Sequence, residues 1–149
     1  MYLDNLKSRL YALRTVDNEQ FRPCTEEEVL ALEQQLKVSL PAAYREFLLW
    51  MGHSTGELFA GSQWNYKKII RLQTGAKEIL ERNSFPEPLP DDAFIFWMHQ
   101  GYQFMFFRLS EGDDPPVYYY HEGRHENSFD KYTDSFSEVL SEAIDESYA

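Results

Sequence analysis

The sequence is short of cysteine and of long apolar runs, and both shortages limit what the protein can be. Cys24 is the single cysteine among 149 residues, which excludes an intramolecular disulfide and a zinc site built from several cysteines. No apolar run approaches the roughly 20 residues that a transmembrane helix needs. The first residues lack the apolar core of a signal peptide. We therefore expect a soluble cytoplasmic protein.

Basic residues are also few. The chain has 14 lysines and arginines against 25 aspartates and glutamates, which gives a net charge of −11 at pH 7. This balance disfavours the binding of nucleic acid or of an anionic membrane through a basic patch. It suits a basic protein partner, although solubility alone is the more general reason for an acidic surface.

Aromatic residues are plentiful, at 16% of the chain, and many lie in residues 93–107. This segment reads as two strands joined by a two-residue turn at Gln100-Gly101, because aromatic and branched residues favour strands and glycine permits a tight turn. Both faces of the hairpin are apolar, so we expect it in the middle of a sheet. The predicted opposite pairs are Trp97 with Phe104, Ile95 with Phe106, Phe96 with Met105 and Phe94 with Phe107.

Apolar residues at helical spacing predict five helices. Thr25 and Glu28 form a capping box before the second of them, and Asp134 is the expected cap of the last. The predicted helices cover about the first 14 residues, a segment from Thr25, the segment from Leu40 to Gly52, a segment from Thr74 and the end of the chain from Phe136. Further strands are predicted at 117–120 and 129–132, with a shorter one at 57–59.

This order of elements predicts an α+β fold, with residues 1–149 forming one domain. We expect a central antiparallel sheet of about four to six strands. The N-terminal helices, one middle helix and one C-terminal helix should pack mainly on one face of it. The other face is either closed by the protein's own segments or open to a partner.

One short motif suggests a different chemistry. His121-Glu122 and His125 match the HExxH pattern of zinc metalloproteases, in which a helix places both histidines on one face and the Glu polarises the metal-bound water. Here the motif follows three tyrosines that read as strand, and Gly123 interrupts it. A polar hairpin tip or strand exit is the favoured interpretation, and a zinc-dependent hydrolase is the disfavoured one. We assign no catalytic residue, no metal ligand and no cofactor.

The segment from Leu40 to Gly52 resembles the Leu-Pro-x-x-Tyr-x-x-Phe-Leu…Asn-Gly signature of the SUKH superfamily, with Met51 in place of the usual Asn. Pro90-Asp91-Asp92, Pro116-Val117-Tyr118 and the Ser-Phe-x-x-x-Leu run from Ser135 follow in a similar order. The superfamily includes fungal cell-wall glucan-synthesis regulators and bacterial toxin-immunity proteins. The signature residues are expected to be structural: Leu40, Pro41, Tyr44, Phe47, Leu48 and Gly52.

The resemblance implies a non-enzymatic, protein-binding domain. The leading hypothesis is a cytoplasmic immunity protein that binds and neutralises a cognate secreted toxin, frequently a nuclease in such systems. The alternative is a regulatory or scaffold protein of the cell-wall-regulator type with an endogenous partner. Aromatic residues ringed by charge are typical of a binding patch, so the candidate partner-binding residues are Trp64, Tyr66, Glu111, Asp113 and Asp114.

Overall fold

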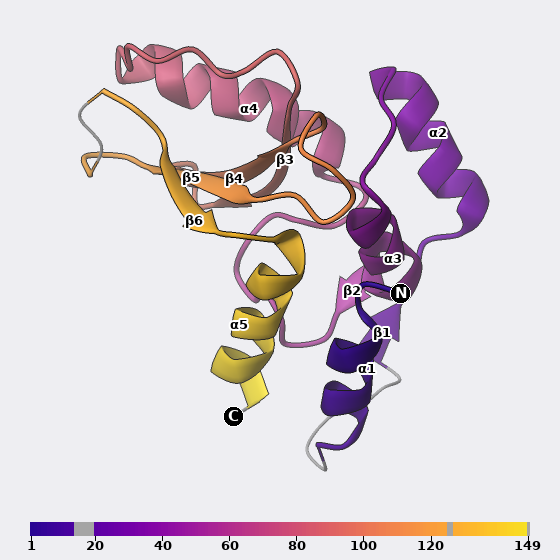
Figure 1. Cartoon of the computed structure of the whole chain (residues 1–149). Helices are drawn as coiled ribbons and strands as arrows, with labels where there is room; N and C mark the ends of the chain where they lie inside the picture. Colours follow the sequence, from indigo (N-terminus) through magenta and orange to yellow (C-terminus); the bar gives the residue numbers. More distant parts are fainter. Residues whose placement is uncertain (14–19, 125–126, 149) are drawn as a thin grey trace.

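A computed structural model describes residues 1–13, 20–124 and 127–148 of the chain (Figure 1). Its helices are α1 (Asp4–Tyr11), α2 (Glu26–Leu36), α3 (Ala42–Met51), α4 (Ile69–Arg82) and α5 (Phe136–Tyr148). Its strands are β1 (Phe21–Arg22), β2 (Ser54–Thr55), β3 (Ala93–His99), β4 (Gln103–Arg108), β5 (Val117–His121) and β6 (Asp130–Thr133). The predicted α+β class is confirmed. No helix in the described ranges has the length and apolarity to span a membrane.

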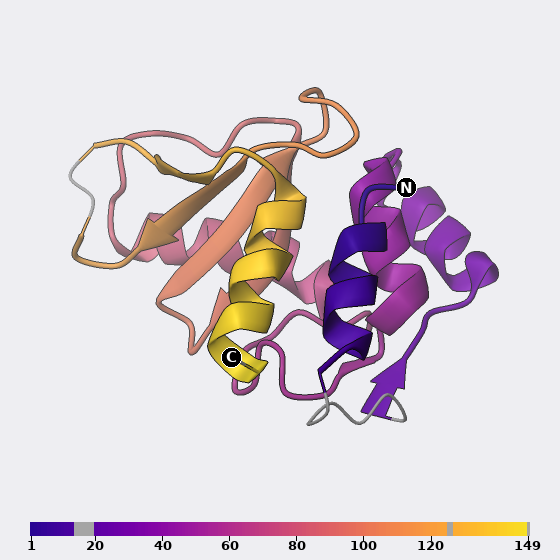
Figure 2. The same cartoon turned by 60° about the horizontal axis from the view of Figure 1, so that its bottom comes forward.

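The four longer strands form an antiparallel meander in the order β3-β4-β5-β6, and β1 and β2 pair separately. Helix α4 lies along one face of the meander, while α5 crosses the opposite face with α1 beside it (Figures 1 and 2). Helix α3 packs on the α5 side, which therefore carries most of the helices. This arrangement divides the apolar interior into two layers, one on each face of the sheet.

The larger layer is centred on Tyr44 of α3, whose side chain is fully buried. Its ring lies 5.3–6.3 Å, between centroids, from five phenylalanine rings of α3, the sheet and α5. The predicted apolar face of α3 is confirmed, because Tyr44, Phe47, Leu48 and Met51 are all buried. The predicted stripe of α5, from Phe136 to Ile144, is buried in the same layer.

Helix α4 closes the second face of the sheet. It packs Leu72, Ala76, Ile79 and Leu80 against a row of sheet residues that consists of Ile95, Met98, Phe104, Phe106 and Tyr120. The sheet therefore has no open apolar face in the described ranges, because the protein's own helix α4 covers the second one. Burying this face removes apolar surface from water, and each Å² removed stabilises the fold by about 25 cal/mol.

The structure corrects the predicted start of α4. The helix begins at Ile69, five residues before Thr74, which was the predicted cap. Thr74 lies inside the helix, and its hydroxyl donates a hydrogen bond to the Arg71 carbonyl at 3.2 Å. The poorly periodic residues before Thr74 become helical because Ile69 and Leu72 are buried: Leu72 packs with the rest of α4 on the sheet, whereas Ile69 packs in the larger layer.

The hairpin prediction is correct at its base and wrong near its turn. Phe94 pairs with Phe107 and Ile95 with Phe106, as expected, but a bulge between Ile95 and Trp97 shifts the register by one. Trp97 then lies opposite Met105 rather than Phe104, and it packs with the α5 layer. A bulge turns the following side chains to the other face, which alternation alone does not reveal.

Strand β3 is an edge strand, so the hairpin is not wholly central as predicted. Its outer edge is nevertheless occupied. The Gln73 side chain of α4 accepts from the Ile95 amide at 3.0 Å and donates to the Ile95 carbonyl at 2.8 Å. Further along, the backbone of Gln63 exchanges two hydrogen bonds with Met98. These contacts satisfy backbone groups that an open edge would offer to another strand.

Two smaller predictions also differ from the structure. Residues 57–59 form no strand; β2 lies just before them at Ser54–Thr55. Asp134 pairs with Lys131 at 2.6 Å, and it is the Ser135 hydroxyl that accepts from the Glu138 amide at the start of α5. The Thr25–Glu28 capping box of α2 is present as predicted.

Candidate functional site

The acidic turn between β4 and β5 holds the N-terminal ends of two helices. The Asp113 carboxylate accepts from the Ala42 amide at 3.3 Å, and the Asp113 carbonyl accepts from the Ala43 amide at 2.8 Å. Pro41 precedes α3 and has no side-chain acceptor, so Asp113 supplies what a capping side chain would. The Asp114 carboxylate accepts from the Ser137 amide of α5 at 2.9 Å. Two of the candidate partner-binding acids thus have structural contacts.

Replacing Asp114 by alanine should lower the free energy of unfolding by about 1 kcal/mol, the usual cost of a lost helix cap. The change removes the acceptor for the Ser137 amide and a negative charge from the positive end of α5. Urea unfolding measures the loss, with Asp91→Ala as the control, since Asp91 is an exposed acid in another loop. Equal stability of the two variants would contradict the capping role.

The other candidate residues also have contacts within the fold. Trp64 is only 9% exposed and packs edge-on against Phe47. The Tyr66 hydroxyl donates to the Glu28 carbonyl at 3.1 Å, and its ring contacts that of His53. Glu111 accepts a hydrogen bond from the Tyr118 hydroxyl. None of these contacts tests partner binding, and they give each side chain a role within the fold.

Residues 121–124, the described part of the HExxH motif, do not form the helix that zinc catalysis requires. His121 ends β5, residues 122–124 form a turn, and Gly123 has a φ of +81°. The Nδ1 atom of His121 lies 3.0 Å from the carbonyl oxygen of Glu122. His125 lies outside the described residues. The described part of the motif is therefore a strand exit, as the polar-tip interpretation predicted.

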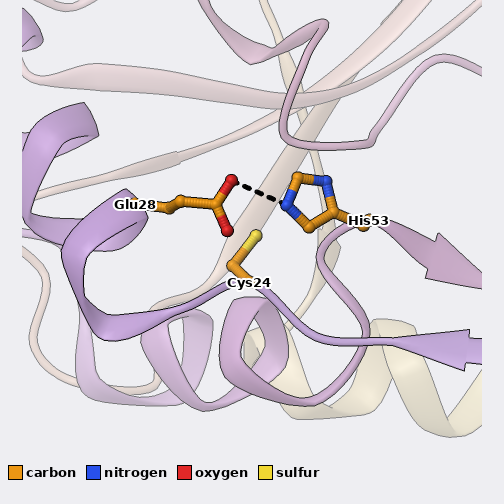
Figure 3. Close-up of side chains that lie close together, drawn as sticks. All are labelled: Cys24, Glu28 and His53. Atoms are coloured by element: carbon orange, nitrogen blue, oxygen red, sulfur yellow. Dashed lines mark hydrogen bonds and ion pairs between the residues drawn. The ribbon is translucent and has the colours of Figure 1, made fainter.

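A cluster that sequence reasoning missed joins Cys24, Glu28 and His53 (Figure 3). Cys24 precedes the cap of α2, Glu28 lies in its first turn, and His53 follows α3. The thiol sulfur, a carboxylate oxygen and a ring nitrogen all lie within 4.8 Å of one another. Glu28 Oε2 and His53 Nε2 are 2.8 Å apart. No sequence motif indicates this cluster, because residue 53 is brought close to residues 24 and 28 only by the packing of α2 on α3.

The electrostatics of the cluster disfavour a reactive cysteine. Burial, with a smaller contribution from Glu28, raises the pKa of the Cys24 thiol to about 12. The pKa of Glu28 is lowered, first by its hydrogen bond from the Thr25 amide and then by His53. His53 Nε2 has Glu28 Oε2 as its hydrogen-bond partner, so no hydrogen bond from the imidazole to the thiol activates the cysteine. A nucleophilic cysteine instead needs surroundings that lower the pKa of its thiol and so favour the thiolate.

Gly52 of the signature is needed because its neighbours leave no room for a side chain. A Cβ atom at this position would overlap Cys24 Sγ and would lie 2.7 Å from the Leu48 carbonyl oxygen. Its φ is −65°, so the glycine is not required by a left-handed conformation. The glycine therefore permits close approach of the end of α3 to the Cys24 segment, whose amide donates to the Leu48 carbonyl at 2.8 Å.

Gly52→Ala should lower the free energy of unfolding by about 1–3 kcal/mol, as overpacking typically does. Gly75→Ala is the matched control, because its Cβ would meet only the flexible end of Met98, at 3.3 Å. Thermal or urea unfolding measures both. Adding Cys24→Ala to Gly52→Ala should recover part of the lost stability, because it removes the overlap with the thiol sulfur. The recovery should be incomplete, because the contact with the Leu48 backbone persists. If Gly52→Ala were as stable as the unchanged protein, the Cys24 segment would have to accommodate the added methyl group without cost.

The second candidate site is a cavity of about 440 Å³ between the sheet and α5. Residues from β3 to β6 form its floor, α5 forms one wall, and the segment 57–62 forms another. Aromatic side chains and carboxylates share the lining, and none of the described lining residues is lysine or arginine. The aromatic lining includes Trp97, Tyr119 and Tyr132, and the carboxylates belong to Glu57, Glu142 and Glu146.

The chemistry of this cavity suits a positively charged group. Glu142 and Glu146 are exposed and one helical turn apart, so they lie on the same side of α5. Tyr119 and Tyr132 meet edge to face, with ring centroids 5.7 Å apart. Burial, a hydrogen bond to Glu142 and the charges of both glutamates raise the pKa of Tyr132 well above its usual value. A cation would relieve this concentration of negative charge and would lie against aromatic rings.

A hydroxyl–imidazole pair also borders the cavity. Ser62 Oγ lies 2.9 Å from His99 Nδ1, and the His99 ring stacks on Trp97. In the described ranges no carboxylate contact with His99 accompanies this pair, so it lacks the third group that orients a catalytic histidine. Ser62 and His99 therefore form a polar part of the cavity wall.

Comparison with known proteins identifies the relationship that the signature suggested. The search of curated proteins gave no match. The model of the SMI1 / KNR4 family (SUKH-1) matches residues 23–142. The match runs from the segment before α2 into α5, so it includes Cys24, the whole meander and the acidic turn. The expected resemblance is confirmed, and the chain belongs to the SMI1 / KNR4 family (SUKH-1).

Proposed function

We propose that this protein is an immunity protein, which binds and neutralises a cognate toxin domain in the cytoplasm of the cell that makes both. The family includes toxin-immunity proteins and proteins of the SMI1/KNR4 type, and its members are generally non-catalytic binding proteins. The observation that carries the proposal is the acidic, aromatic-lined cavity between the sheet and α5. It offers a docking point for a charged side chain.

The charge of the chain supports a basic partner. A toxin domain that acts on nucleic acid needs a basic surface to hold the phosphate backbone. A protein with a net charge of −11 attracts such a surface over a distance and speeds encounter. An acidic inhibitor that covers the basic surface also prevents the substrate from reaching it. We therefore propose a nuclease-type toxin as the partner class.

The cavity gives this attraction a defined contact point. An arginine or lysine from the toxin would enter between the α5 wall and the tyrosines, with Glu142 and Glu146 beside its charge. A cation held against an aromatic ring gains about 0.5–2 kcal/mol, more when water is excluded. Buried anchors of this kind carry most of the energy of an interface.

Co-expression with the toxin encoded beside the gene for this protein tests the proposal. The expected results are restored growth and a stable complex of the two purified proteins. Persistent growth arrest with every neighbouring toxin, and no complex with any of them, would contradict the immunity role. If the protein instead captured an endogenous cell-wall enzyme or regulator, the regulatory alternative would replace it.

A further inference from the structure

The cluster of Cys24, Glu28 and His53 combines three groups that ligate transition metals on three separate segments. The backbone holds each segment in place. The Cys24 amide donates to the Leu48 carbonyl at 2.8 Å, and the His53 amide donates to the Arg22 carbonyl at 2.9 Å. Glu28 belongs to the capping box, where its Oε1 accepts from the Thr25 amide at 3.0 Å. The other carboxylate oxygen is left for the cluster.

We propose that Cys24, Glu28 and His53 form a binding site for Zn²⁺, with Sγ, Oε2 and Nε2 as the three protein ligands. This site is independent of the proposed toxin-binding cavity, which lies between the sheet and α5. Residue numbers and spacing do not suggest it, because two ligands precede α3 and the third follows it.

The ligand set selects the metal. A thiolate and an imidazole favour zinc over magnesium or calcium, which prefer oxygen ligands alone. The ligand atoms lie within 4.8 Å of one another. Bonds of about 2.0–2.3 Å to a central zinc ion would place them roughly 3.3–3.7 Å apart in a tetrahedron. Glu28 Oε2 and His53 Nε2, now 2.8 Å apart, need to separate by only a fraction of an ångström.

The surroundings provide both a dry side and an open side. Cys24 is 4% exposed, whereas the side chains of Glu28 and His53 are 31% and 26% exposed. Figure 3 shows the thiol directed between the carboxylate and the imidazole. A zinc ion would enter from the solvent side, and water would fill the fourth position. The thiol proton would pass to solvent on binding, as it does when a cysteine becomes a zinc ligand.

Zinc bound here would join the segment before α2 to the loop after α3. These segments flank the signature helix at Gly52, where the approach of Cys24 leaves no space for a Cβ atom. Because the ion binds the folded arrangement and a preformed site is absent from the unfolded chain, zinc should raise the melting temperature. It should also protect Cys24 from alkylation during brief opening of the fold.

The test titrates metal-free, untagged protein with Zn²⁺ alone and measures heat, stoichiometry and melting temperature. One bound equivalent, a higher melting temperature and slower maleimide labelling of Cys24 are expected. Cys24→Ser, Glu28→Gln and His53→Asn should each weaken binding by at least the roughly 10–100-fold that loss of an outer-shell partner costs. Co²⁺ provides a second readout, since a cobalt–thiolate bond gives a charge-transfer absorption band that Cys24→Ser should abolish.

His121→Ala is the matched control, because His121 lies at the end of β5, outside the cluster. It should bind Zn²⁺ as tightly as the unchanged protein. Binding that survives His53→Asn and disappears in His121→Ala would overturn the proposal and would assign the metal to the strand exit. Absence of saturable binding to the unchanged, folded protein would also overturn it. Circular dichroism of each variant separates loss of a ligand from loss of the fold.

Discussion

Replacing Tyr44 by alanine is expected to lower the free energy of unfolding by about 3–5 kcal/mol, the range for removal of a large buried aromatic ring. The ring is fully buried and touches five phenylalanine rings from α3, β3, β4 and α5. Its removal would leave a cavity where helices and sheet meet. Urea unfolding, monitored by tryptophan fluorescence, measures the change. The loss would be a large fraction of the total, because small domains are stable by only about 5–15 kcal/mol.

Tyr44→Phe separates the ring from its hydroxyl. In the described ranges the Tyr44 hydroxyl is buried without a hydrogen-bond partner, and burial raises its pKa well above the usual value. An unsatisfied buried polar group costs about 1–3 kcal/mol. The phenylalanine variant should therefore equal or exceed the unchanged protein in stability. A loss comparable to that of Tyr44→Ala would contradict this account and would show that the hydroxyl has an essential partner.

Local patterns in the sequence predicted most of the elements correctly. The Thr25–Glu28 capping box, the apolar face of α3 and the stripe of α5 each depend on residues a few positions apart. Strand β5 follows from its run of tyrosines. Such patterns are reliable because the side chains that define them are neighbours within one element.

The errors arose where a distant segment decides the local structure. The bulge after Ile95 places Trp97 on the α5 side of the sheet, and the outer edge of β3 is hydrogen-bonded by Gln73 of α4 rather than by another strand. The start of α4 is set by packing of Ile69 and Leu72, since no side chain caps it. Tertiary packing overrides local propensity in each case.

The candidate sites were less predictable than the fold. Asp113 and Asp114 were candidate partner-binding residues in the sequence, and only the structure shows that they hold the starts of α3 and α5. The cavity brings Tyr132 of β6 beside Glu142 of α5. The sequence does not reveal what an acidic residue contacts. Its charge is the same whether it caps a helix, lines a cavity or lies on a solvated surface.

The cavity proposal predicts a large effect of charge on partner binding. Glu142→Lys combined with Glu146→Lys should weaken binding of a basic toxin domain by at least about 100-fold, since like charges brought together at an interface cost several kcal/mol. The reason is local: the variant places two positive charges where the toxin's cation would enter. Surface plasmon resonance at low and moderate salt measures the affinity and the association rate.

Glu78→Lys combined with Glu81→Lys is the matched control. Both residues are exposed on α4, on the opposite face of the sheet, and the pair changes the net charge by the same amount. If long-range attraction alone governs binding, the two variants should slow association equally, because the net charge is the same in both. If the cavity holds a cationic side chain, only the α5 variant should also accelerate dissociation. Equal effects of the two pairs on both rates would therefore remove the cavity from the interface, while leaving the acidic character of the protein as the source of attraction.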